Sequence, residues 1–163
     1  MKKYIVVVSV IVALMTACNS TRQDGNQRED STLTTNTDAT KKEIPFQTAE
    51  RYFVKNTVEN KNLTLKITNQ EDFDNYFEAA ATMGESGKPT VIDFSKQFVI
   101  AIIAESSSIE KNIIVSDLTS KENELSVSYK IDEKGEERSY VSRSLSLMIV
   151  DNKYSGEVKF EKQ

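Results

Sequence analysis

The chain has 163 residues, a formal net charge of -4, one cysteine, and neither histidine nor tryptophan. This length allows a single modest domain beside any targeting segment. The lone cysteine excludes an intramolecular disulfide, and the lack of histidine removes the commonest general base and transition-metal ligand. Basic residues alternate with acidic ones, as in 130–134, instead of clustering, so nucleic acid is not expected as a partner.

The N-terminus has the pattern of a signal peptide. Met1-Lys2-Lys3 is cationic, residues 4–15 are apolar, and the small residues Thr16-Ala17 precede Cys18. The apolar run is shorter than the roughly 20 residues that a membrane-spanning helix needs. Permanent insertion is therefore the weaker interpretation.

Residues 15–18 resemble the lipobox of bacterial lipoproteins, with Met15 where leucine is usual. The resemblance implies removal of residues 1–17 and acylation of Cys18; the alternative is an ordinary signal peptide with an incidental cysteine. Acyl chains contribute about 0.8 kcal/mol per buried methylene, which suffices for anchoring when two or three are present. We therefore expect a lipid-anchored protein of a bacterial cell envelope, at the outer membrane or periplasmic face, with a lipid on Cys18.

A polar, disordered tether is predicted to follow the lipid, over residues 18–43. Residues 19–42 contain almost no large apolar side chain, so the conformational entropy lost on ordering them would outweigh the free energy gained from burial. Within them, Asp30-Ser31-Thr32 resembles a short O-glycosylation signal of exported Bacteroides proteins. Without Lys2 and Lys3, 19 basic residues remain against 25 acidic ones, so an anionic membrane surface is not an electrostatic target. The folded domain is predicted over 44–163.

The first elements of this domain are a strand and a helix. Leu63, Leu65 and Ile67 alternate with polar residues, which predicts a half-buried strand with one face in solvent. Residues 68–71 have the form of a capping box, with Thr68 as the cap, and predict a helix from about 69 to 82. Its aromatic residues at helical spacing, Phe73 and Phe77, are assigned to the core.

Residues 84–90 end the predicted helix and superficially resemble a phosphate-binding loop. The glycine spacing, Pro89 after Lys88, and the helix-to-strand order all depart from the Walker pattern, so no nucleotide site is expected. Residues 98–104 are continuously apolar. They predict a central strand covered on both faces.

Three further strands are predicted at 112–118, 125–131 and 140–150, with residues 132–137 as a hairpin turn between the last two. Residues 151–156 are expected to turn the chain into a final hairpin strand at 157–160. Together these patterns predict an α+β fold, with a largely antiparallel sheet of about five to six strands and one early amphipathic helix.

Residues 92–102 resemble the family of the protease complex subunit PrcB, in which a similar turn leads into a hydrophobic strand after a helix like 71–77. The order of elements over about 60–161 is compatible with that family. The chain departs from it at 105–110, where the family strand usually runs into a glycine-rich segment. The resemblance, shared with a set of uncharacterised Bacteroides-type lipoproteins, implies a non-catalytic accessory role.

Several catalytic and metal sites were considered. Asp93, Ser95 and Lys96 could form a Ser/Lys site, but neighbours in sequence rarely achieve that geometry, and a turn cap is the preferred interpretation. Nothing marks a cleft for paired carboxylates, and Asp72-x-Asp74 lacks the rest of a calcium loop. We therefore expect no enzyme activity, cofactor or metal.

The preferred function is a protein-binding module that uses a strand edge or loops. Its predicted contact surface is the serine-rich loop Glu105, Ser106, Ser107, Ser108 and Ile109. Modulation of an envelope protease is the specific form that the PrcB resemblance implies. The alternative is a small hydrolase acting on envelope polymers.

Overall fold

The continuous apolar run that begins at Phe98 forms the central strand, β6 (Gln97–Ile103), in a computed structural model that describes residues 41–80 and 87–163. Alternate side chains of a strand point to opposite faces. Phe98, Ile100 and Ile102 therefore enter one apolar cluster, and Val99, Ala101 and Ile103 enter another. All six side chains are buried, which confirms the prediction of a central strand covered on both faces.

One antiparallel sheet surrounds β6, in the order β2 (Gln47–Thr48), β9 (Leu145–Asp151), β6 and β4 (Leu63–Ile67). The alternation predicted for β4 is correct, but its polar face is half-buried instead of facing solvent. The Lys66 ammonium lies 4.8 Å from the Phe98 ring centroid and donates to the Gly156 carbonyl oxygen at 2.6 Å. Lys66 thus covers one edge of the core.

A second sheet has the order β1 (Lys42–Glu43), β7 (Glu110–Lys121), β8 (Glu124–Lys134) and β10 (Glu157–Lys162). The predicted final hairpin is wrong, because β10 pairs with β8 in parallel and not with β9. A short 3-10 turn, Asn152–Tyr154, carries the chain between the two sheets. Val158 and Phe160 can then pack against the core that the sheets share.

The predicted hairpin turn at 132–137 is also wrong. Residues 132–134 continue β8 and pair with residues 110–112 of β7. The tight turn lies at the other end of this ribbon, at Glu122–Asn123, where Glu122 has a φ of 57°. β9 begins at Leu145, so residues 140–144 of the predicted strand instead form a crossing between the sheets.

The helix α1 (Gln70–Tyr76) is shorter than the predicted 69–82 and begins one residue later. Asn69, not Thr68, is the N-cap, and its side-chain oxygen accepts from the Asp72 N–H at 2.8 Å. The helix ends at Tyr76 because the next residues form β5 (Phe77–Ala79), which pairs with β3 (Tyr52–Val54). Phe73 and Phe77 are each 2% exposed, which confirms their assignment to the core.

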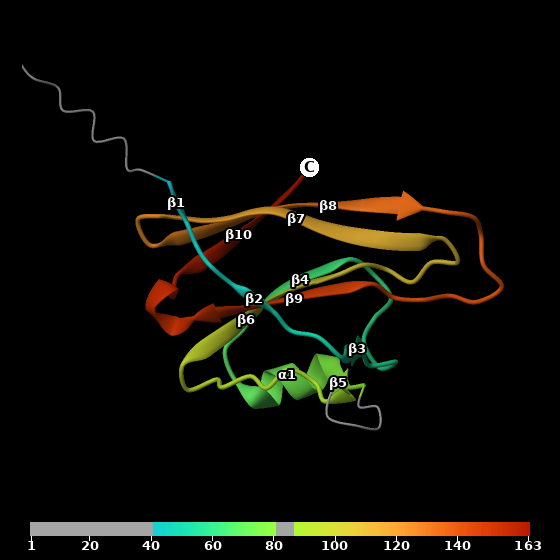
Figure 1. The fold of residues 1–163 in the computed structure, drawn as a ribbon, viewed down its shortest axis with the longest axis horizontal. Coiled ribbons are helices and arrows are strands. Elements are labelled where there is room, and N and C mark those ends of the chain that lie inside the picture. Colours follow the sequence, from blue (N-terminus) through green and yellow to red (C-terminus); the bar gives the residue numbers. More distant parts are fainter. Residues whose placement is uncertain (1–40, 81–86) are drawn as a thin grey trace, which may run out of the picture. The chain divides into compact units, whose positions relative to one another are not determined.

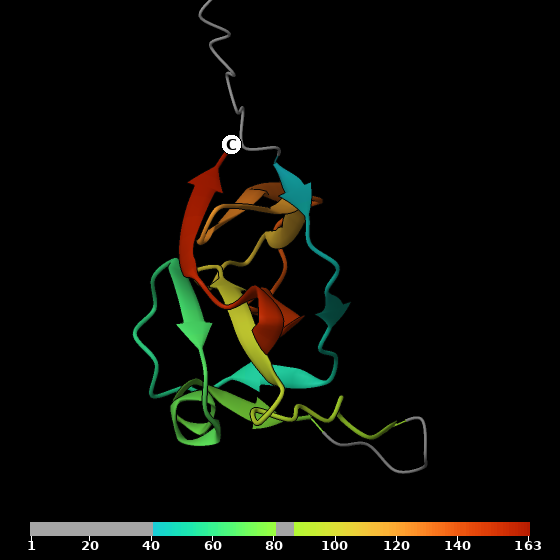
Figure 2. The same ribbon diagram turned by 90° about the vertical axis from the view of Figure 1, so that its left-hand side faces the viewer.

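These elements form three layers (Figures 1 and 2). The two four-stranded sheets enclose one core, and α1 with the β3–β5 pair covers the outer face of the β6 sheet. The fold is mostly antiparallel sheet with one helix, as predicted, but the described residues form ten strands in three sheets instead of five to six in one. Strands of two or three residues account for four of the ten, and segments this short show no periodicity.

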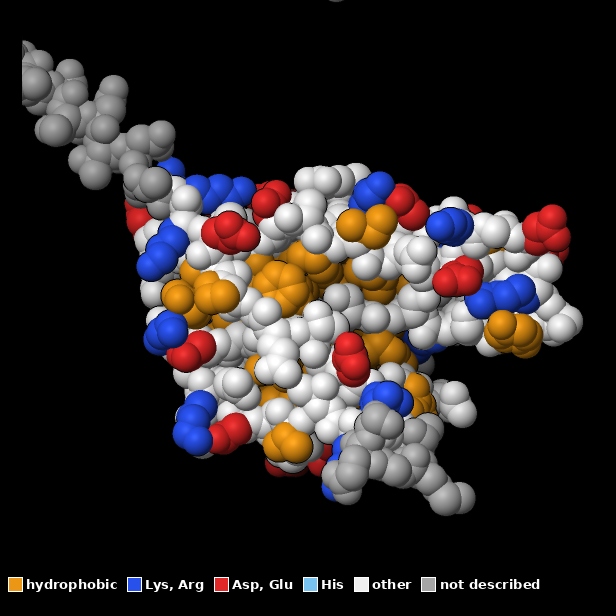
Figure 3. Space-filling model, viewed as in Figure 1, with side chains coloured by type: hydrophobic (Ala, Val, Ile, Leu, Met, Phe, Trp, Pro, Cys, Tyr) orange, Lys and Arg blue, Asp and Glu red, His pale blue; other side chains and the backbone are white. Residues whose placement is uncertain are grey.

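The chain enters the described domain through β1, whose residues lie in the range predicted as a tether. Ile44 then enters the core, and the chain crosses from the sheet that contains β7 to the sheet that contains β9. Between these two layers, apolar side chains form a band on the face shown in Figure 3. Cys18, the predicted signal peptide and residues 30–32 lie outside the described residues, as do residues 81–86, which include the end of the predicted helix. Within the described residues, no helix is long and apolar enough to span a membrane.

Candidate functional site

Arg143, in the crossing that precedes β9, holds together two loops at one end of the molecule. Its guanidinium donates to the carbonyl oxygens of Ala104, Val58, Glu59 and Lys61 at distances of 3.0, 3.1, 2.7 and 3.0 Å. Burial lowers the pKa of the Arg143 guanidinium from its ordinary value. A planar group with five donors can satisfy several carbonyls at once, so a single side chain fixes the loop between β3 and β4.

The serine-rich loop 105–109 is anchored at both ends. The N–H groups of Glu105 and Ser106 donate to the side-chain oxygens of Asn62 and Asn60 at 3.0 and 2.7 Å. Ser107 exchanges two backbone hydrogen bonds with Ser142, each 3.0 Å long. The loop is therefore fixed to the same β3–β4 loop that Arg143 holds.

The side chains of this loop are engaged in different ways. Ser108 donates to a Glu137 carboxylate oxygen at 2.9 Å, and Ile109 is half-buried. Glu105 is exposed, and its carboxylate lies 2.9 Å from the Lys111 ammonium, which lowers the pKa of Glu105. Ser106 alone of the five predicted contact residues lines the groove described next.

A groove of about 500 Å³ lies where the β3–β4 loop meets the crossing before β9. Two apolar side chains at the groove are unusually exposed, Phe53 at 44% and Val141 at 69%. Cations are present, but no acidic residue contributes to the lining. The lining consists of Phe53, Val54, Lys55, Asn56, Val58, Asn60, Ser106, Val141 and Arg143.

Sequence reasoning found Ser106 but missed the rest of the groove, because its residues come from three segments that lie far apart in the chain. Two signals were nevertheless present. Residues 56–62 contain three asparagines, whose side chains can hydrogen-bond to backbone groups, and Arg143 stands alone among uncharged residues between Val141 and Leu145. Neither signal specifies which segments meet.

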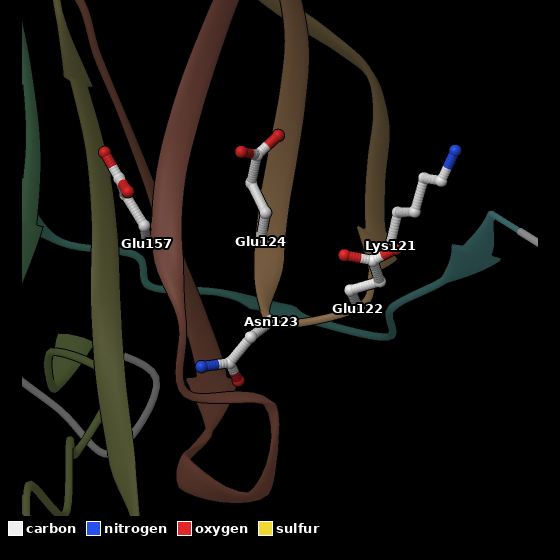
Figure 4. A pocket seen from close by; sticks show the side chains of 5 residues that line it. All are labelled: Lys121, Glu122, Asn123, Glu124 and Glu157. Atoms are coloured by element: carbon white, nitrogen blue, oxygen red, sulfur yellow. The ribbon is translucent and has the colours of Figure 1, made fainter. Parts of the chain in front are cut away.

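A second hollow, at the β7–β8 turn, is lined by Lys121, Glu122, Asn123, Glu124 and Glu157 (Figure 4). The carboxylates do not converge. Glu124 is already paired with the Lys159 ammonium at 2.5 Å, and Glu122 projects from the turn on the side away from Glu157. Across residues 41–80 and 87–163, no group of three or more potential ligands is placed to hold a metal ion.

The residues weighed as a Ser/Lys site form an exposed turn that leads into β6. The Ser95 hydroxyl and the Lys96 ammonium both donate to the Asp93 carboxylate, at 2.5 and 2.8 Å. These bonds, with a further one from the Ser95 N–H, lower the pKa of Asp93 to about 2. Asp93 thus caps the turn, as preferred from the sequence, and the Lys96 side chain is 79% exposed instead of being enclosed beside the hydroxyl.

Comparison of the chain with family models, with curated proteins and with solved structures finds no match in any of the three. The resemblance to the PrcB family therefore stays a prediction from the residues that carry it.

Proposed function

We propose that this protein is a lipid-anchored component of a bacterial cell envelope whose domain binds another protein without catalysing a reaction. The observation that carries the binding role is the groove, where exposed Phe53 and Val141 flank a rigidly held Arg143. Exposed apolar side chains beside fixed polar groups are typical of binding surfaces. The lining offers one hydroxyl, that of Ser106, and no carboxylate, which favours contact over acid–base chemistry.

The position of the groove in the domain supports this proposal. The chain enters at β1, which pairs with β7 beside the β7–β8 turn, whereas the serine-rich loop precedes the first residue of β7 (Figure 1). The 12 residues of β7 extend over roughly 40 Å at about 3.3 Å per residue. A tether that leads into β1 thus joins the domain at the end remote from the groove, which leaves the groove accessible to a partner.

The anchor is tested by intact mass and detergent partitioning of the protein from its native host. We expect the wild-type protein to enter the detergent phase with an acyl-shifted mass that begins at Cys18, because its acyl chains bury many methylenes. The Cys18→Ala variant is expected to lose both properties. An unmodified wild-type protein in the aqueous phase would make a freely secreted binding protein the better description.

The binding role is tested by photo-crosslinking in living cells from a reactive amino acid placed at position 141. We expect a protein adduct from this position. Position 91 is the matched control, because Val91 is an apolar residue that is 87% exposed and does not line the groove. Equal adducts from both positions, or none from position 141 and from position 53, would count against the groove as the contact surface.

Protease modulation is the finer form of this proposal and rests on the PrcB resemblance at residues 92–102. Its test is the identity of the protein crosslinked at position 141. A protease in that adduct supports the finer form. A pull-down from envelope extract that recovers no protease counts against it.

A further inference from the structure

One edge of β3 has no partner strand among the described residues. The Lys55 N–H donates to Tyr76 at 2.9 Å, and the Ala80 N–H donates to Arg51 at 2.8 Å. Backbone groups of an antiparallel strand alternate in direction, so residues 51, 53 and 55 face β5 and the N–H and C=O groups of Tyr52 and Val54 face away from it. No other described strand pairs with β3, although just before it the Thr90 N–H donates to the Glu50 carbonyl oxygen on this same edge at 3.2 Å. Val54 is 8% exposed and lines the groove.

The charge at the groove is uncompensated. Lys55 and Arg143 both line it, and neither forms an ion pair with a carboxylate of the described residues. The Lys55 ammonium donates to the Asp74 carbonyl oxygen at 2.5 Å, and four of the five Arg143 N–H donors are used by carbonyls. One donor on Nη1 of Arg143 is left over, in a protein whose net charge is negative.

We propose that the groove binds an extended acidic segment of a partner polypeptide, which pairs with the open edge of β3. This inference rests on the proposed function and names the chemistry of the partner. Backbone pairing with Val54 supplies a donor and an acceptor, and a carboxylate side chain binds Arg143 and Lys55. An aliphatic side chain of the same segment packs against Phe53 and Val141.

The unpaired backbone groups of β3 favour a polypeptide over other anionic ligands. A phosphate polymer satisfies the two cations but provides no N–H groups in strand register for the Val54 carbonyl. Phe53 and Lys55 are two residues apart in the same extended segment and therefore share one face. An extended peptide also presents alternate side chains to one face, so it can place an aliphatic side chain beside Phe53 and, two residues along, a carboxylate beside Lys55. Both requirements of the groove are met by one strand.

The test uses the full chain in nonionic detergent and a fluorescein-labelled peptide, Thr-Val-Thr-Glu-Thr-Glu-Thr with an amidated C-terminus, in which the valine and both glutamates share one face of the extended chain. Binding is measured by fluorescence anisotropy. We expect saturable binding that weakens about tenfold when both glutamates become glutamine, because charge-assisted hydrogen bonds are lost. N-methylation of alternate residues should weaken binding as much, since it removes the donors that pair with β3. Inorganic polyphosphate that competes as well as the unlabelled peptide would overturn the inference.

Variants of the protein localise the binding. Val141→Glu places a carboxylate at the groove and should abolish binding, whereas Val91→Glu, at a more exposed valine outside the lining, should leave it unchanged. Lys55→Gln should weaken binding about threefold. Equal binding by the Glu and Gln peptides would overturn the inference.

The two proposals fail in distinguishable ways. If position 141 crosslinks to a protein in cells but the acidic peptide does not bind, the inference about partner chemistry is wrong and the binding role stands. If the peptide binds equally well to Val141→Glu, the groove is not its site. Loss of both the cellular adduct and peptide binding overturns both proposals.

Discussion

Arg143 shows how one side chain can hold separate stretches of backbone together. Its guanidinium donates both to the carbonyl of Ala104, the residue that follows β6, and to three carbonyls of the β3–β4 loop. Arg143→Ala should lower the free energy of unfolding by about 2–4 kcal/mol, because four carbonyls lose charge-assisted hydrogen bonds, two of which are part-buried. Arg143→Lys should recover less than half of this loss, since one ammonium cannot reproduce the planar fork. Urea unfolding measures both.

The control for Arg143 is Lys134→Ala. Lys134 is an exposed cation at the end of β8, and its removal should change the free energy of unfolding by no more than about 0.5 kcal/mol. An Arg143→Ala variant as stable as this control would show that water satisfies the four carbonyls as well as the guanidinium does.

Asp93 provides a prediction about pH. The ammonium of Lys96 and the hydroxyl and N–H groups of Ser95 lower the pKa of Asp93 from 3.8 to about 2 in the folded protein. A lowered folded-state pKa contributes stability above the unfolded-state value, and this contribution is lost as the pH falls from about 4 through 2. NMR titration of the Asp93 carboxyl carbon should give a midpoint near 2 in the wild type and nearer 4 in Lys96→Met. Equal midpoints would contradict the turn geometry.

At the scale of elements, Gly156 determines how β10 reaches β8. A Cβ atom at this position would clash with the backbone carbonyl of Asn123 in the β7–β8 turn. Gly156→Ala should therefore destabilise the domain by about 1–3 kcal/mol, as overpacking against backbone does. Ser155→Ala is the neighbouring control, at an exposed residue with φ of -56°, and should be near neutral. Amide exchange of β8 should accelerate only in Gly156→Ala, because β10 is the strand displaced.

Elements whose signal is local were predictable from the sequence, and elements set by distant pairing were not. The continuous apolar run of β6 and the alternation of β4 gave their positions because each burial pattern repeats within a few residues. α1 ends early because residues 77–79 pair as a strand with β3, about 25 residues upstream. Local propensity does not indicate such a distant pairing. The parallel placement of β10 likewise depends on the space beside β8, which only the assembled sheet defines.

For the molecule as a whole, the candidate site was harder to predict than the fold. The serine-rich loop was chosen for its composition, and the structure instead uses its backbone to fix a neighbouring loop while Ser106 reaches the groove. Exposed Phe53 and Val141 carry no sequence signal, since an apolar residue in a strand or loop is usually assigned to the core. Their exposure depends on how three layers meet at one end of the domain.

The boundary of the domain also follows from the whole assembly. Ile44 is 2% exposed in the core between the sheets, and its N–H donates to the Leu118 carbonyl oxygen at 2.8 Å. A fragment that begins at residue 41 should fold cooperatively, and one that begins at residue 46 should be less stable by about 2–4 kcal/mol, because it leaves a cavity and frees the β7 edge. Ile44→Ala in the full chain should reproduce most of this loss, and Phe46→Ala, at 41% exposure, less than half. Equal unfolding midpoints of the two fragments would place the start of the cooperative unit after Pro45 and leave β1 outside it.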